Sequence, residues 1–411
     1  MTSLAKWLSY VESLHPKSWD LGLVRVQTVA ERLPPISSGT VFLVAGTNGK
    51  GSTCEYIDQL CRCCGLVVGK STSPHLINFN ERIQINGQTA SDEEIVSAFD
   101  TIERARGDIS LTYFEFAVLA SLLIFTNHKV DVSVLEVGLG GRLDAMNIVT
   151  PDVSVVTQVA LDHQEWLGHS RDAIAAEKAC IMRPDTPCVI ADRDPPDTLR
   201  KYAMQVGANP HFIGTDFDLH DGHFVSGDVQ FSALPQLRLP TDSAAAALQT
   251  VVCADIIPDS DTVHEVLAQT ALPGRRQWLT PRLLVDVAHN PAAAQYLKAY
   301  LEELPASTVH AVVGMYRDKE FAQVLQMMSP SVDHWYFTDM PLARAADALA
   351  LAEAIRPIYR SGNVMTYDKI ETALNNAMRH SAIEDLIVVF GSFPVVAGVI
   401  EAVYPLSLSK A

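Results

Sequence analysis

The sequence predicts an α/β protein of two domains, a P-loop-type domain with a mostly parallel sheet followed by a smaller Rossmann-like α/β domain. Its 411 residues exceed what one hydrophobic core usually serves, and 48% of them are hydrophobic. Short apolar runs alternate with stretches of helical length, which is typical of parallel sheets covered on both faces. A Pro-Gly pair within Ala271–Gln277 indicates a linker, after which the alternation begins again. We therefore place the domains at residues 1–273 and 274–411.

The expected elements follow these apolar runs. The N-terminal segment is amphipathic at helical spacing, and Asn209–Leu239 is short, mixed and turn-rich, which predicts antiparallel strands at the edge of the first sheet. Helices are expected at Phe114–Phe125, Arg171–Met182 and Asp242–Ala254. Strands are expected at Val41–Ala45, Val132–Val137, Val153–Val159, Cys188–Ala191, Leu283–Val287, Val309–Val313, Trp335–Thr338, Val364–Tyr367 and Leu386–Phe390.

The composition argues against several kinds of partner. A net charge of −17 repels both a nucleic-acid backbone and an anionic membrane surface. We expect no signal peptide and no membrane-spanning segment, and therefore a cytoplasmic monomer whose reduced thiols are buried or half-buried. The seven cysteines follow no disulfide spacing, and a zinc site is disfavoured because the cluster Cys54, Cys61, Cys63 and Cys64 lies along a predicted helix.

The sharpest motif is GTNGKGS, Gly46 to Ser52, between a buried strand and a helix. Glycines there allow backbone N–H groups to surround phosphate oxygens at a helix N-terminus. Lys50 supplies a charge for the β- and γ-phosphates, and Ser52 or Thr53 supplies a hydroxyl for Mg²⁺. The spacing departs from the usual P-loop because Gly51 separates the lysine from the hydroxyl, and a tight structural turn is the alternative.

Other polar residues follow predicted strands, where ligands bind in open α/β sheets. Glu136 ends one strand and His163 follows another. Glu136 suits a hard cation, although a satisfied acidic loop residue is an equal alternative. Nothing local distinguishes Lys178 from a solvated helical lysine. In the second domain, Asp286 ends the first strand, and His289 opens the next helix at a turn that can bind a nucleotide or a second substrate.

These motifs together resemble the Mur ligase superfamily and, within it, the bacterial bifunctional dihydrofolate synthase/folylpolyglutamate synthases. The resemblance runs from about Trp7 to Val399. Of its motifs, EVGLGGRLDA indicates the folate branch rather than the peptidoglycan branch. The motifs that carry it, in the family's order, are GTNGKGS, STSPHL, ERI, SLTYFE, EVGLGGRLDA, LDHQEWLG, EKA, LPGR, DVAHNP and GSF.

The resemblance implies a role for each matching position. Lys178 matches a lysine that is carbamylated in the family, and His289 matches a position near the incoming amino acid; with Lys50 these are the expected catalytic residues. ATP-binding positions are Thr47, Asn48, Gly49, Lys50, Gly51, Ser52, Ser243, Arg275 and Asp286. Metal ligands are Ser52, Ser73, Glu136 and His163. The pterin or folate site comprises Asp20, Leu21, Gly22, Leu23, Thr112, Tyr113, Phe114, Leu143, Asp144 and Ala145.

The family also implies the reaction. ATP, with Mg²⁺ and K⁺ as the candidate ions, phosphorylates a carboxylate of dihydropteroate or of tetrahydrofolate or another reduced folate, and L-glutamate then attacks the acyl phosphate. Two alternatives stay open, namely a Mur-type ligase for another acid and a nucleotide-binding protein without ligase activity. Three positions depart from the family pattern: Ser243 replaces an asparagine at the adenine, Pro394 replaces a histidine, and Met146 gives AMN for ATN.

Overall fold

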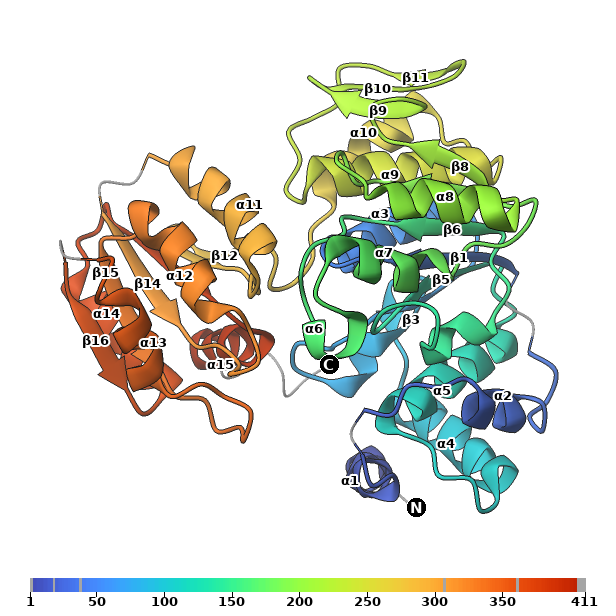
Figure 1. Cartoon of the computed structure of the whole chain (residues 1–411), viewed down its shortest axis with the longest axis horizontal. Coiled ribbons are helices and arrows are strands. Elements are labelled where there is room, and N and C mark those ends of the chain that lie inside the picture. Colours follow the sequence, from blue (N-terminus) through green and yellow to red (C-terminus); the bar gives the residue numbers. More distant parts are fainter. Residues whose placement is uncertain (1–2, 18, 37–38, 306–307, 360–361, 405–411) are drawn as a thin grey trace. The chain divides into compact units, whose positions relative to one another are not determined.

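The computed structural model describes residues 3–17, 19–36, 39–305, 308–359 and 362–404. The chain divides into two compact units, Met1–Thr270 and Ala271–Ala411. Each unit contains a large sheet with helices packed against it (Figure 1). The predicted fold class, a mostly parallel α/β sheet domain followed by a smaller one, is therefore confirmed.

The main sheet of the first unit has eight strands. Six neighbouring strands, β2, β5, β1, β6, β7 and β8, are parallel. The two remaining strands, β3 and β4, are antiparallel and extend the sheet beyond β2. The order of all eight strands is β4 (Gln88–Thr89), β3 (Ile83–Ile85), β2 (Val68–Ser71), β5 (Val132–Glu136), β1 (Thr40–Ala45), β6 (Val153–Val156), β7 (Pro187–Ile190) and β8 (Asn209–Phe212).

Helices cover both faces of this sheet. They are α1 (Leu4–Leu14), α2 (Val24–Ala30), α3 (Lys50–Cys63), α4 (Asp92–Arg106), α5 (Tyr113–His128), α6 (Gln164–Leu167), α7 (Arg171–Ala179), α8 (Asp197–Val206), α9 (Thr241–Cys253) and α10 (Ser260–Gln269), with short 3₁₀ turns η1 (Phe79–Arg82) and η2 (Ala145–Ile148). On β1, Leu43 packs into the core that α1, α4, α5, α7 and α8 share. Phe42 and Val44 are equally buried on the opposite face, where α3 and α9 pack together. Burial on both faces explains why β1 is continuously apolar.

The turn-rich segment folds differently from its prediction. Only β8 joins the main sheet, and it does so in parallel with β7. The antiparallel strands β9 (Phe217–His220), β10 (His223–Ser226) and β11 (Val229–Phe231) form a separate three-stranded sheet, visible beside α9 in Figure 1. The prediction of antiparallel strands at the edge of the first sheet was wrong in this respect, because strand pairing depends on partners that a local pattern does not name.

Two predicted elements end three residues earlier than expected. The strand expected at Val153–Val159 stops at Val156, because Gln158 then forms a bridge with Asn48 in the glycine-rich loop. The helix expected at Arg171–Met182 ends at Ala179, where hydrogen-bonded turns precede Pro184.

The second unit has its own six-stranded sheet. The strand order is β12 (Gln277–Thr280), β13 (Leu283–Val285), β17 (Leu386–Phe390), β14 (Val309–Val313), β15 (His334–Thr338) and β16 (Val364–Tyr367), and only β12 is antiparallel. The helices are α11 (Pro291–Glu302), α12 (Phe321–Met328), α13 (Ala348–Ile355), α14 (Ile370–His380) and α15 (Phe393–Val403), with the turn η3 (Ser329–Ser331). A core built on alternate strand residues joins α11, α12 and α13, while α14 and α15 pack together.

All seven cysteines are free thiols, and Cys63 and Cys64 are exposed, contrary to the prediction of buried or half-buried thiols. Within the described ranges, no helix combines the length and the apolarity that crossing a bilayer requires.

A buried ion cluster ties α3 to β2. Lys70 of β2 is ion-paired with Glu55, and its Nζ lies 3.7 Å from Oδ2 of Asp58, whose other partner is Arg62. Lys70 and Asp58 are almost completely buried. Removing one partner from such a cluster leaves a buried charge without its counter-ion, which costs more than the intact cluster contributes.

We therefore expect Lys70→Ala to lower the free energy of unfolding by ~3–5 kcal/mol. Urea denaturation of the purified protein measures this loss. The control is Lys298→Ala, which removes a partly exposed ion pair with Glu302 at 3.6 Å and is expected to change stability little. Equal stability of the two variants would show that the buried cluster contributes no more than a surface pair.

Candidate active site

The glycine-rich loop joins β1 to α3 in a conformation that only glycine tolerates. Gly49 caps α3 with φ +91°, a left-handed conformation. A Cβ on Gly46 would lie 1.7 Å from Oγ1 of Thr157, and one on Gly49 would lie 3.1 Å from Oγ of Ser243. Ser243 of α9 also donates a hydrogen bond to the Gly49 carbonyl at 3.4 Å. The structure therefore brings Ser243 to the loop, although the two residues are far apart in sequence.

Side chains of the loop brace it against the segment that follows β6. Thr47 Oγ1 donates to the Ala160 carbonyl and accepts from the Ala160 N–H, both at 3.0 Å. Asn48 Nδ2 donates to Oε1 of Gln158 at 3.0 Å. Thr157 Oγ1 donates to the Asn48 carbonyl at 2.7 Å. These contacts fix the loop's shape at the carboxyl edge of the sheet, where ligands bind in α/β folds.

Two lysines meet at one carbonyl of this loop. Lys50 Nζ donates to the Gly46 carbonyl at 3.1 Å, and Lys178 Nζ donates to the same oxygen at 2.9 Å. Lys178 lies on α7 and is 3% exposed, so it is not the solvated helical lysine that its local sequence allows. Burial, and then the charge of Lys50, lower the pKa of Lys178 to about 7. A buried lysine of this kind is partly neutral at physiological pH and therefore nucleophilic.

Candidate cation ligands surround the same edge of the sheet. Glu136, the last residue of β5, is buried, and its Oε2 accepts a hydrogen bond from the Ser73 N–H at 3.0 Å. Ser52 is buried in the first turn of α3. Among described residues, no three His, Cys, Asp or Glu side chains form a group that could hold a metal ion. One carboxylate with serine hydroxyls suits Mg²⁺, which binds through few protein ligands and takes the remaining oxygens from water and phosphates.

His163 adopts an unusual backbone conformation just before α6. Its φ is +50°, and its Nε2 lies 3.9 Å from Oδ2 of Asp162. Its ring centroid is 5.7 Å from that of Trp19, which stacks on Trp166 with centroids 6.1 Å apart. A non-glycine residue in this left-handed region is uncommon and is often found at functional sites.

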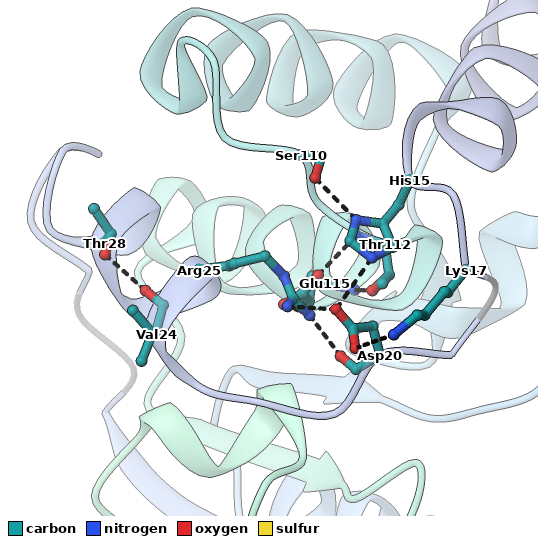
Figure 2. Close-up of polar contacts among 9 residues, drawn as sticks. All are labelled: His15, Lys17, Asp20, Val24, Arg25, Thr28, Ser110, Thr112 and Glu115. Atoms are coloured by element: carbon teal, nitrogen blue, oxygen red, sulfur yellow. Dashed lines mark hydrogen bonds and ion pairs between the residues drawn. The ribbon is translucent and has the colours of Figure 1, made fainter.

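The predicted acceptor loop is held by an arginine that the sequence did not single out. Arg25 Nη1 donates to Oδ2 of Asp20 at 2.6 Å and Nη2 donates to the Asp20 carbonyl at 2.5 Å, as Figure 2 shows. Nη2 also lies 3.2 Å from Oε1 of Glu115. Oδ2 of Asp20 is 3.2 Å from His15 Nε2, and Oδ1 is 3.7 Å from Lys17 Nζ. Partial burial raises the pKa of Asp20, but the charged groups around it lower this pKa by a larger amount. The pKa of Asp20 therefore lies below its ordinary value.

Glu115 connects this loop to the start of α5. Its Oε2 accepts from the Thr112 N–H at 2.7 Å, and Thr112 Oγ1 accepts from the Glu115 N–H at 3.2 Å, which forms a capping box. Arg25 therefore joins two predicted acceptor segments, the loop of Asp20, Leu21, Gly22 and Leu23 and the helix start at Thr112. Tyr113 and Phe114 follow on α5 and are both partly buried.

The third predicted acceptor segment is a loop organised by its own aspartate. Asp144 is buried, and its oxygens accept from the backbone N–H groups of Leu139 and Met146 at 2.8 and 2.9 Å. Burial raises the pKa of Asp144 to about 6, against the lowering effect of these hydrogen bonds. Leu143 is partly exposed, whereas Ala145 is buried at the start of η2.

In the second unit, Asp286 and His289 follow β13, and Arg275 precedes β12. Asp286 accepts from the N–H groups of Ala288 and Arg276 at 2.8 and 2.9 Å. His289 Nδ1 donates to the Val287 carbonyl at 2.9 Å, just before the Asn290 cap of α11. The Arg275 guanidinium lies 5.1 Å from the ring centroid of Phe393, and the His289 ring lies 6.4 Å from it.

Comparison with known proteins identifies both units. Residues 44–230 match the Mur ligase middle domain, and residues 274–393 match the Mur ligase, glutamate ligase domain. The dihydrofolate synthase/folylpolyglutamate synthase of Escherichia coli (strain K12) is 41% identical over 408 residues, which cover 97% of this chain and 95% of that protein.

Solved structures agree over nearly the whole chain. E. coli FolC in complex with DHPP and ADP matches with a TM-score of 0.94 and 40% identity, covering 98% of both chains. A bifunctional folylpolyglutamate synthase/dihydrofolate synthase with Mn, AMPPNP and L-glutamate bound matches with a TM-score of 0.92 and 41% identity, again over 98% of both chains. This chain therefore belongs to the Mur ligase superfamily and, within it, to the family of the dihydrofolate synthase/folylpolyglutamate synthases.

Proposed function

We propose that this chain adds L-glutamate, at the expense of ATP, to dihydropteroate, forming dihydrofolate, and to tetrahydrofolate or other reduced folates, forming polyglutamates. The strongest support is the 41% identity to the E. coli enzyme across both units. The braced glycine-rich loop, with Lys50 beneath it and Glu136 and Lys178 at the same sheet edge, suits transfer of the γ-phosphoryl group.

The chemistry explains why such a site is required. A carboxylate is a poor electrophile until its oxygen attacks the γ-phosphorus and ADP leaves. The amine of glutamate then attacks the acyl phosphate, phosphate departs with the carboxylate oxygen, and the amine loses a proton. Loop N–H groups and Lys50 stabilise the charge that builds on the transferring group. The protein must also exclude water, because hydrolysis of the acyl phosphate is the competing reaction.

Mg²⁺ is the proposed metal, held by Ser52, Ser73, Glu136 and His163, and K⁺ is a second candidate ion. Bound Mg²⁺ supplies positive charge to the phosphates and to the reacting carboxylate. The oxygen ligands fit this ion, whereas His163 is atypical for it and rests on the family resemblance. The related structure with Mn and AMPPNP bound supports the use of a divalent metal with the nucleotide.

The remaining predicted residues divide between nucleotide, acceptor and amino acid. Thr47, Asn48, Gly49 and Gly51 would surround ATP together with Ser243, while Arg275 and Asp286 of the second unit stay predicted ATP-binding positions. His289 would act near the incoming glutamate, and a related protein has been solved with L-glutamate bound. A cytoplasmic monomer stays a prediction from the composition.

One experiment separates this function from its two alternatives. We expect the purified enzyme to release phosphate from ATP only with glutamate and either dihydropteroate or tetrahydrofolate, and not with a peptidoglycan precursor. Lys50→Ala should reduce turnover on the order of 100-fold or more, because one preorganised charge at the phosphoryl group is lost. Turnover of tetrahydrofolate alone would make the enzyme monofunctional, and no turnover at all would leave a nucleotide-binding protein.

Carbamylation of Lys178 is a second expectation. Carbon dioxide reacts with the neutral amine, and a pKa of about 7 means that the neutral fraction falls as the pH drops below this value. Activity should therefore decline between pH 8 and pH 6 more steeply in bicarbonate-free buffer, and ¹³C-bicarbonate should give a carbamate signal in NMR. Lys178→Ala should lose both the activity and the carbamate signal. A short carboxylate such as acetate should restore part of the activity. Lys201→Ala, an exposed lysine on α8, is the control; the same carbamate signal in Lys178→Ala would refute the assignment.

Arg25 provides a test of the acceptor loop. Arg25→Gln removes the ion pairs to Asp20 and Glu115, so we expect the KM for dihydropteroate to rise several-fold and the KM for ATP to stay unchanged. Arg25→Lys should be intermediate, because lysine cannot make the paired contacts. Arg32→Gln is the control, since Arg32 donates to the Ala105 and Arg106 carbonyls at the end of α4. A rise in the KM for ATP alone would place the loop elsewhere.

A further inference from the structure

Two tryptophans lie together beside His163. Trp19 stacks on Trp166 with an interplanar angle of 26°. Trp19 directly precedes Asp20 of the acceptor loop, and Trp166 belongs to the short helix α6 that follows His163. The pair therefore connects a proposed metal ligand to the proposed pterin side of the site.

Trp166 is not a core residue, and Trp19 packs against the core while remaining only partly buried. Trp7 and Trp335 are essentially fully buried, whereas Trp166 is 45% exposed and Trp19 is only partly buried. Leaving a large indole in water forgoes its burial free energy, and exposed aromatic rings are enriched where a ligand covers them.

The chemistry of the acceptor indicates what lies against these rings. In dihydropteroate, an aminobenzoyl ring separates the pterin from the reacting carboxylate. If Asp20, Leu21, Gly22 and Leu23 contact the pterin and His163 lies at the metal beside the carboxylate, this aromatic ring falls between them. Trp19 occupies that intermediate position, since it is next to Asp20 in the chain and 5.7 Å from the His163 ring.

We propose that Trp19 and Trp166 form a stacking surface for the aminobenzoyl ring of the acceptor. Binding of dihydropteroate then depends on these two rings more than binding of reduced folates does. This inference rests on the proposed function. In dihydropteroate the reacting carboxylate is bonded directly to the ring, so the ring must lie next to the metal. In a folate the reacting γ-carboxylate is a whole glutamyl residue away from the ring. The ring is then displaced from the pair.

The test measures KM for each substrate separately in Trp19→Leu and Trp166→Leu. We expect the KM for dihydropteroate to rise on the order of 2- to 10-fold, the range that an aromatic pair provides. The KM for tetrahydrofolate should change less, and those for ATP and glutamate should not change. Trp19→Phe should keep the KM for dihydropteroate close to the wild-type value, because phenylalanine can still stack on the substrate ring. A purely structural role of the indole would not explain this result.

A binding measurement accompanies the kinetics. Dihydropteroate added without ATP should quench tryptophan fluorescence in the wild type, and the quenching should shrink in Trp19→Leu and Trp166→Leu. The matched control is Trp278→Leu in the second unit, a ring that is 40% exposed and donates its Nε1–H to Tyr300 at 3.0 Å. This variant should keep both the quenching and all KM values.

The outcomes separate the two proposals. Suppose that the wild type turns over both acceptors. The tryptophan surface would then be overturned if Trp19→Leu and Trp166→Leu leave the KM for dihydropteroate and the quenching unchanged. An equal rise of the KM for dihydropteroate and of the KM for ATP would overturn it as well. A wild type inactive with both acceptors would overturn the proposed function, and the quenching in Trp19→Leu would still decide whether the rings contact dihydropteroate. A variant with a lowered melting temperature is replaced by Trp19→Phe and Trp166→Phe, for which a smaller rise is expected.

Discussion

The Gly46 carbonyl, shared by Lys50 and Lys178, is the contact on which the arrangement of the first unit's site depends. It follows β1, the strand between β5 and β6, and one of its donors, Lys50, belongs to the same loop, whereas the other, Lys178, lies 132 residues further along the chain. Burial makes charging Lys178 costly, and the ammonium group of Lys50 at the same oxygen adds repulsion. The site resolves this conflict by favouring the neutral amine. The same contact therefore places Lys178 and makes it chemically reactive.

A second constraint acts on the acceptor side. The loop of Asp20, Leu21, Gly22 and Leu23 has no regular secondary structure, and Arg25 fixes it by bonding Asp20 and Glu115 together. Glu115 in turn completes the cap of α5, so the loop is attached to a helix that is buried in the core. Asp20 is consequently a structural anchor of this loop, and its Oδ2 already accepts from Arg25. The interpretation of Asp20 as an acceptor for pterin amino groups applies mainly to Oδ1.

Local patterns predicted the parts of the fold that depend on neighbours in sequence. The apolar run of β1, the glycines after it and the start of α3 are readable because each follows from its own residues. The pairing of β8 to β11 was mispredicted because register and partners are set by tertiary contacts. Lys178 and Arg25 could not be recognised from their surroundings, since a helical lysine or arginine is usually solvated. Their burial and partners come from segments that the chain brings together only on folding.

The main sheet also ends in a way that bears on how the protein behaves at high concentration. Its outermost strands are β4, with only two exposed residues, and β8, whose second residue is Pro210. A very short strand and a strand with a missing N–H both offer few unpaired backbone groups to another chain. Edge-to-edge pairing between copies is thereby discouraged at both borders of the sheet, so the long parallel array is protected against aggregation by the two strands that contribute least to it.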